Sequence, residues 1–144
     1  MKNLWIVVML GGLMSVASMP NNAEDWIPID SGEELTQMLS GVTFDHPQYV
    51  DHYRRDGVMA YYNKVYDSIA VRKWVVDDSG KVCTFIYVVP DKLVDCYLFS
   101  KSASEAGLVR MTMFERGDSY KMRITDATDP KIIQAINDVA GPEN

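Results

Sequence analysis

The sequence predicts a mainly β protein, an antiparallel meander of about eight strands that forms a barrel or a strongly bent sheet. Apolar and β-branched runs alternate with short turn signals from residue 42 to residue 125. Asp56-Gly57 and Pro90-Asp91 are typical of tight hairpin turns. Helical periodicity occurs near the two ends of this region, which adds a short N-terminal helix and a C-terminal helix packed on the sheet.

The first seventeen residues have the pattern of a secretory signal peptide. Lys2 provides a positive charge, Leu4 to Leu13 is an apolar run, and Ser15 and Ala17 are spaced like the small residues before a cleavage site. A retained membrane anchor is the alternative, but a spanning helix needs about 20 apolar residues. We therefore expect a signal peptide at 1–17 that is cleaved near Ala17, a flexible leader at 18–30 and a single β-rich domain at 31–144.

A short helix is predicted to begin after Ser31. Ser31 and Glu34 have the spacing of a capping box, in which each side chain accepts a hydrogen bond from a backbone N–H of the other residue. Leu35 and Leu39 lie on one apolar stripe, so the helix must pack on something apolar. Gly41 is expected to end it in the left-handed conformation.

From Val42 the pattern changes to period two. Strands are predicted at 42–45, 48–54 and 58–66, with Asp56 and Gly57 as the two central residues of a type I′ turn. This turn places Tyr53 opposite Ala60. Both faces of the hairpin then mix aromatic and charged residues, which suits a barrel mouth, a polar-aromatic cavity or an ordinary edge hairpin. The predicted faces are Tyr49, Asp51, Tyr53, Ala60, Tyr62 and Lys64 on one side, and Val50, His52, Arg54, Met59, Tyr61 and Asn63 on the other.

Each strand of the next predicted hairpin contains one of the two cysteines. After a strand at 69–76, strands at 81–89 and 92–100 turn at Pro90-Asp91 and bring Cys83 opposite or nearly opposite Cys96. Directly paired antiparallel residues are close enough for a disulfide, so we predict one between Cys83 and Cys96. The alternative is two free buried cysteines, and the predicted export to an oxidising compartment favours the disulfide.

The chain is predicted to end in a last hairpin and a helix. Strands at 108–115 and 120–125 flank the turn Arg116-Gly117-Asp118. Asp129 and Pro130 are a typical helix start, with Asp as the N-cap and Pro as the first helical residue. Gly141-Pro142 closes this helix. We expect it to pack across the sheet or to close one end of the barrel.

Short motifs are spread over residues 39–97, namely Leu39-x-Gly41-x-Thr43, Tyr53, Asp56-Gly57, Trp74, Asp78-x-Gly80-x-x-Cys83 and Cys96-Tyr97. Together they resemble small secreted or periplasmic bacterial lipocalin-like proteins of unassigned function. Gly41-Val42-Thr43 stands where lipocalins have Gly-x-Trp. The resemblance implies a calycin-like barrel and a periplasmic or secreted location, and it implies no activity and no catalytic residue.

Charge and motif content disfavour several functions. A formal net charge of −6 disfavours nucleic-acid binding, which needs a basic face. The two histidines, His46 and His52, are about 20 Å apart on an extended strand, too far to share a metal ion unless the chain bends at Pro47. No serine has the context of a nucleophile beside a base. We therefore predict no enzyme activity, no catalytic residue, no metal and no cofactor.

A tyrosine cluster is the main indication of function. Five tyrosines occur within the 18 residues from Tyr49 to Tyr66, beside Arg54 and Arg55. Binding surfaces use aromatic faces and arginine in this way, although tyrosine also simply favours strands.

The prediction is an exported binding module, either a barrel that holds a small apolar or amphipathic ligand or a protein-binding adaptor or inhibitor. The alternatives are a periplasmic enzyme with scattered site residues and a structural envelope protein. The candidate binding surface is Tyr49, His52, Tyr53, Arg54, Tyr61, Tyr62 and Trp74. The expected partner is an unknown small ligand or an envelope protein, with no membrane span after signal cleavage.

Overall fold

The computed structural model describes residues 24–89 and 91–144, and this part of the chain contains nine strands and two helices. The predicted signal peptide at 1–17 and the leader residues 18–23 lie outside the described residues. In chain order the elements are β1 (Trp26–Ile29), α1 (Gly32–Leu39), β2 (Val42–Asp45), β3 (Tyr49–Tyr53), β4 (Val58–Asn63), β5 (Ser68–Val76), β6 (Val82–Ile86), β7 (Leu93–Ser102), β8 (Leu108–Met113), β9 (Ser119–Thr125) and α2 (Pro130–Ala140).

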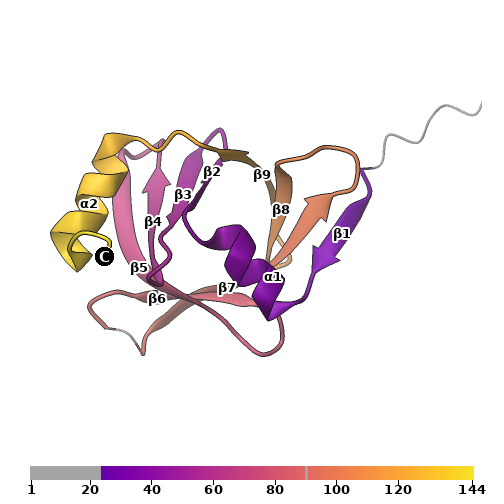
Figure 1. Ribbon diagram of the computed structural model, residues 1–144, viewed down its shortest axis with the longest axis horizontal. Helices are drawn as coiled ribbons and strands as arrows, with labels where there is room; N and C mark the ends of the chain where they lie inside the picture. The colour runs from indigo at the N-terminus through magenta and orange to yellow at the C-terminus, as the bar shows by residue number, and fades with distance from the viewer. Residues whose placement is uncertain (1–23, 90) are drawn as a thin grey trace, which may run out of the picture.

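Strands β2 to β9 form a closed antiparallel barrel. Each of them pairs with the next along the chain, and β9 pairs back with β2, where Thr43 lies opposite Thr125. Figure 1 shows the strands wrapping around a common interior. The predicted meander of about eight strands is confirmed, and of its two forms the barrel is the one observed. Closure pairs the edges that an open sheet would expose.

Strand β1 is an addition to the barrel and a correction to the prediction. It pairs with β7 over residues 26–29, where Ile29 lies opposite Phe99, along the edge of β7 that β6 leaves unpaired. Ile29 is buried, with only 3% of its surface exposed. The prediction of a flexible leader at 18–30 is therefore wrong for these four residues, because they satisfy an open strand edge and bury an apolar side chain.

The β3–β4 hairpin has a different register from the predicted one. Tyr53 lies opposite Met59 rather than Ala60, because the loop contains three residues, not two. The Arg54 N–H donates to the Val58 carbonyl at 2.8 Å, and Gly57 takes the left-handed conformation with φ of +82°. A slip of one residue turns every side chain of β4 to the opposite face. Met59, Tyr61 and Asn63 therefore face the barrel interior, together with Tyr49, Asp51 and Tyr53.

Helix α1 lies across one end of the barrel (Figure 1). Its apolar residues Leu35 and Leu39 are fully buried in the interior core. The predicted cap is present, since the Glu34 N–H donates to Ser31 Oγ at 3.3 Å. The Glu34 carboxylate, however, pairs with Lys101. The helix thus closes this end of the barrel.

Helix α2 packs outside the barrel, against β4 and β5 (Figure 1). Ile132 and Ile136 are fully buried there, in a second core that includes Val58 and Ala60. The Asp129 side chain caps the helix by accepting from the Lys131 N–H at 3.0 Å. Of the two predicted positions, packing across the sheet is confirmed. Neither helix in the described part of the chain is long and apolar enough to cross a membrane.

The two cysteines are joined as predicted. Cys83 on β6 lies opposite Cys96 on β7, and the two form a disulfide with Cα atoms 4.1 Å apart. Beyond them the pairing shifts between Thr84 and Phe85. The strands consequently end at Ile86 and resume at Leu93, so the connection is longer than the predicted turn at Pro90-Asp91.

Candidate binding cavity

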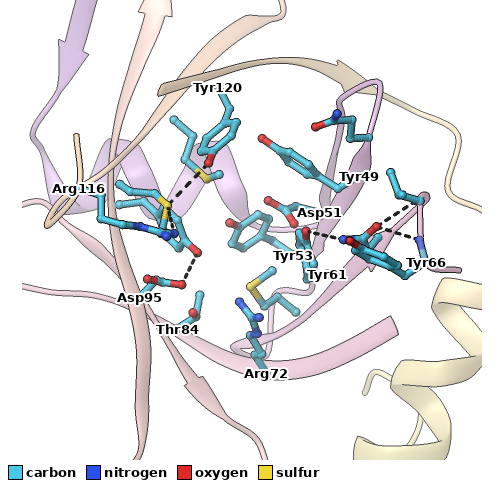
Figure 2. A pocket seen from close by; sticks show the side chains of 17 residues that line it. Tyr49, Asp51, Tyr53, Tyr61, Tyr66, Arg72, Thr84, Asp95, Arg116 and Tyr120 are labelled. Atoms are coloured by element: carbon cyan, nitrogen blue, oxygen red, sulfur yellow. Dashed lines mark hydrogen bonds between the residues drawn. The ribbon is translucent and has the colours of Figure 1, made fainter. Parts of the chain in front are cut away.

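A cavity of about 460 Å³ lies inside the barrel. Its exposed lining residues include Tyr66 in the β4–β5 turn and Arg116 in the β8–β9 turn. These turns are at the barrel end opposite α1, so the cavity opens there. Figure 2 shows the seventeen side chains that line it. Because successive strands run in opposite directions, the start of β2 and helix α1 lie at one end of the barrel, and the β4–β5 and β8–β9 turns lie at the other.

Tyrosine rings form much of the cavity wall. The ring centroids of Tyr49 and Tyr61 are 5.7 Å apart, and those of Tyr49 and Tyr120 are also 5.7 Å apart with nearly perpendicular planes. The edge-to-face arrangement of Tyr49 and Tyr120 is one that aromatic rings prefer. The wall also holds two buried methionines, Met111 and Met113, which the cavity shares with the core. The lining tyrosines are Tyr49, Tyr53, Tyr61, Tyr66, Tyr97 and Tyr120.

Three buried polar atoms on this wall have no hydrogen-bond partner among the described residues. They are the Tyr49 hydroxyl, Oδ1 of Asp51 and Oγ1 of Thr84. The exposed fractions of the three residues are 6%, 3% and 0%. Buried polar groups in folded proteins almost always have a partner, and leaving one without costs about 1–3 kcal/mol. All three residues line the same cavity, so the polar groups that lack a partner lie together in its wall.

Burial changes the acid–base chemistry of the cavity. Loss of water raises the pKa of Asp51 from 3.8 to about 7, and the positive charge of Arg72 opposes part of this shift. Burial, and secondarily the nearby Asp51 charge, raises the pKa of Tyr49. Tyr49 therefore remains a neutral hydroxyl at neutral pH, while Asp51 titrates there.

Two arginines reach the cavity at different depths. The Arg72 guanidinium carbon lies 5.3 Å from the ring centroid of Tyr61. Arg116 lies at the mouth, where its side chain is 66% exposed and its Nε pairs with Asp118 at 3.7 Å. The second cavity carboxylate, Asp95, accepts from the Tyr97 hydroxyl at 3.3 Å. Figure 2 shows Asp51 among the tyrosines, with Arg72 below it and Arg116 farther out to its left.

The structure brings part of the predicted binding surface together. Tyr49, Tyr53 and Tyr61 line the cavity. Trp74 lies one layer behind them, with its ring 5.6 Å from that of Tyr53 in an edge-to-face arrangement. Its indole N–H donates to the Arg54 carbonyl at 3.0 Å. Trp74 therefore supports the wall rather than forming it.

The other three predicted residues lie on the outer face of the hairpin. His52 Nδ1 bonds the Thr43 hydroxyl at 2.8 Å. Arg54 donates to the Gly141 carbonyl at 2.8 Å, at the end of α2. The Tyr62 hydroxyl accepts from Lys131 Nζ at 2.6 Å, at the start of α2. Arg54 and Tyr62 thus attach α2 to the barrel, on the side away from the cavity.

Asp51, Arg72 and Thr84 line the cavity but were not among the residues of the predicted binding surface. The alternation Tyr49-x-Asp51-x-Tyr53 places the carboxylate on the tyrosine face, so this signal for Asp51 was present. Arg72 and Thr84 belong to β5 and β6, and a single sequence gives no indication of which face of those strands meets the tyrosines once the barrel closes.

No metal centre is apparent in the part of the chain that the structure describes, where no three His, Cys, Asp or Glu side chains cluster as ligands. Comparisons with protein-family models, with curated proteins and with solved structures found no match to this chain. Function is therefore inferred from the cavity itself, through its volume, its tyrosine rings and its unpartnered polar atoms.

Proposed function

We propose that this protein is an exported binding module that holds a small amphipathic ligand inside a lipocalin-like barrel. One observation carries the proposal. The Tyr49 hydroxyl, Asp51 Oδ1 and Thr84 Oγ1 are buried, have no hydrogen-bond partner within the described part of the chain and belong to residues that line one cavity. A ligand with a polar group can satisfy these atoms, while its apolar part packs on the tyrosine rings.

The cavity has a suitable size for this role. Its volume of about 460 Å³ falls within the range of about 300–1,000 Å³ that ligand pockets usually have. An eight-stranded barrel is just wide enough to be filled by side chains or to hold one small ligand. The size and the strand count together support the lipocalin-like assignment.

The disulfide supports export. Disulfides persist in oxidising compartments and are rare in the reducing cytosol. Cys83 and Cys96 are joined across two neighbouring strands, so the bridge belongs to the barrel wall. This supports the proposed location in the periplasm or outside the cell.

Two measurements test the binding function. Native mass spectrometry of protein purified gently from its exported form should detect a retained small molecule. Phenylnaphthylamine, an uncharged dye that fluoresces in apolar sites, should bind the emptied protein saturably and with one site per chain. Tyr61→Ala should weaken dye binding about tenfold, because it removes an aromatic wall.

The neighbouring tyrosine provides a matched control. Tyr62 carries the same side chain on the outer face, where its hydroxyl bonds Asp67 and Lys131. Tyr62→Ala should leave the dye affinity unchanged within about twofold, which is below 0.5 kcal/mol. Equal losses in both variants, or no saturable dye binding and no retained molecule, would reject an interior binding site.

Acid–base catalysis at Asp51 is a second candidate function. A carboxyl group with a pKa of about 7 in a cavity is suited to proton transfer at neutral pH. Asp51, however, makes no side-chain hydrogen bond to a nucleophile or second base among the described residues, so binding is favoured. Recovery of the retained molecule chemically unchanged after incubation supports binding, whereas conversion to a product supports catalysis.

A further inference from the structure

The cavity combines a buried carboxylate with several aromatic faces. Asp51 is on β3 between Tyr49 and Tyr53, whose side chains point to the same interior. Tyr61 faces them from β4, and Figure 2 shows Asp51 at the centre of these rings. Aromatic rings attract cations through the negative potential of their faces, most strongly where water is excluded. Two features near Asp51 therefore favour a positively charged occupant, namely the carboxylate itself and the surrounding aromatic rings.

The hydrogen-bonding capacity of the site indicates the same preference. An ionised carboxylate can only accept hydrogen bonds, and Oδ1 of Asp51 receives none from the described residues. An occupant that meets the ionised carboxylate must therefore donate. The Tyr49 and Thr84 hydroxyls can accept or donate, so they are compatible with a donor and do not require an acceptor.

The two arginines that line the cavity, Arg72 and Arg116, interact with groups other than the Asp51 carboxylate. No ion pair joins Asp51 to Arg72 among those of the described residues, and the Arg72 guanidinium lies over Tyr61 instead. Arg116 is exposed at the mouth and paired with Asp118. Arg72 can also donate hydrogen bonds to an acidic ligand, so a ligand with a carboxylate is the main alternative to a cation. The buried acceptor atom of Asp51, which has no partner among the described residues, favours a cation over a carboxylate.

We propose that the occupant is an organic amine, held as an ammonium ion with an N–H group on the Asp51 carboxylate and its apolar part among the tyrosine rings. The inference rests on the proposed binding function and specifies its ligand class. Primary and secondary amines fit this description, because they combine a positive charge with N–H donors. Quaternary ammonium ions lack the donor that Oδ1 of Asp51 requires.

Three probes of nearly equal size test the charge preference. Phenethylamine is a cation at pH 8, phenethyl alcohol is neutral and phenylpropanoate is an anion. Their affinities are measured by displacement of phenylnaphthylamine from the full-length mature protein and by calorimetry. The amine should bind about tenfold more tightly than the alcohol, and the anion most weakly, as expected for a charge-assisted hydrogen bond in a dry site.

Removing the carboxylate should remove the preference. Asp51→Asn should weaken amine binding about tenfold and change alcohol binding less than about threefold. Asp78→Asn, which removes an exposed carboxylate of the β5–β6 turn outside the cavity, is the control and should keep the preference for the amine. Circular dichroism checks that both variants are folded, and the three-probe series on the unmodified protein decides the question even if Asp51→Asn fails to fold.

The outcomes separate the two proposals. Equal affinities for amine and alcohol, a preference for the anion, or no binding of any of the three probes would overturn the amine proposal. If phenylnaphthylamine still binds and Tyr61→Ala still weakens it, the interior binding site stands and its ligand is of another class. If the dye also fails to bind and no molecule is retained, both proposals fall.

Discussion

Asp51 and Arg72 share the interior of the barrel, yet no ion pair between their side chains is found among the described residues. The Arg72 guanidinium lies over the ring of Tyr61 instead. Its charge acts on Asp51 from a distance and offsets only part of the cost of burial, so the pKa of Asp51 reaches about 7. The carboxylate therefore destabilises the empty barrel when it is ionised.

Asp51→Asn should stabilise the empty protein at high pH. The pKa of Asp51 is higher in the folded chain than the usual 3.8, so the folded state holds a proton that the unfolded state has released. Stability from this group is greatest below pH 4, falls as pH rises toward 7 and stays low above it. Urea unfolding should show a gain of about 4 kcal/mol at pH 8 that shrinks below about 1 kcal/mol at pH 4.

An exposed carboxylate provides the control for this experiment. Asp78 lies in the β5–β6 turn with its side chain exposed, and Asp78→Asn should change the free energy of unfolding by less than about 0.5 kcal/mol at both pH values. A loss of stability for Asp51→Asn at pH 8 would show that the carboxylate supports the fold, and would contradict its assignment as a ligand-facing group.

The disulfide should contribute a large part of the stability of the barrel. The Cys83–Cys96 bridge has a sequence separation of 13, and closing a loop of this length stabilises a fold by about 3 kcal/mol in the chain-entropy model. The double variant Cys83→Ala and Cys96→Ala should lose about this amount in urea unfolding. A change below about 1 kcal/mol would mean that strand pairing alone holds β6 against β7.

Gly80→Ala should destabilise the contact between the β5–β6 turn and the chain after β1. Gly80 has a φ of +77°, and a Cβ there would lie 2.5 Å from the Asp30 carbonyl oxygen. Backbone strain and this overlap together should cost about 3 kcal/mol. Gly117 has a similar φ of +72° with no atom within 4 Å of its Cβ position, so Gly117→Ala should cost only about 1 kcal/mol. Equal losses would show that the close approach carries no cost.

Local patterns in the sequence were sufficient to predict most of the fold. Asp129-Pro130 and Ser31 mark the two helix starts because capping is a local interaction. Cys83 and Cys96 could be paired because a hairpin connects them directly. Strand β1 was missed because four residues, two of them exposed, carry little periodic signal. It pairs with residues 99–102 of β7, about 70 residues away in the chain, and local patterns do not predict such a pairing.

The candidate site was harder to predict because it depends on register. The Asp56-Gly57 signal predicted the hairpin correctly, but the loop begins one residue earlier, at Arg55. That single residue decides whether Tyr61 or Tyr62 faces the interior. The cavity side chains from β5 to β9 join the tyrosines only through closure of the barrel, which no local pattern reports.

Arg54→Ala should release the end of α2 without emptying the cavity. The Arg54 side chain is buried, pairs with Asp56, and donates to Asn137 at 3.3 Å and to the Gly141 carbonyl at 2.8 Å. Losing the last two bonds should cost about 2 kcal/mol and speed amide exchange in the final turn of α2. Arg55→Ala, which removes the neighbouring exposed guanidinium, should leave that exchange unchanged. Because Arg54 points away from the barrel interior, dye binding should persist in both variants. Loss of dye binding in Arg54→Ala together with unchanged exchange in α2 would place this residue at the binding site and contradict the assignment of the outer face.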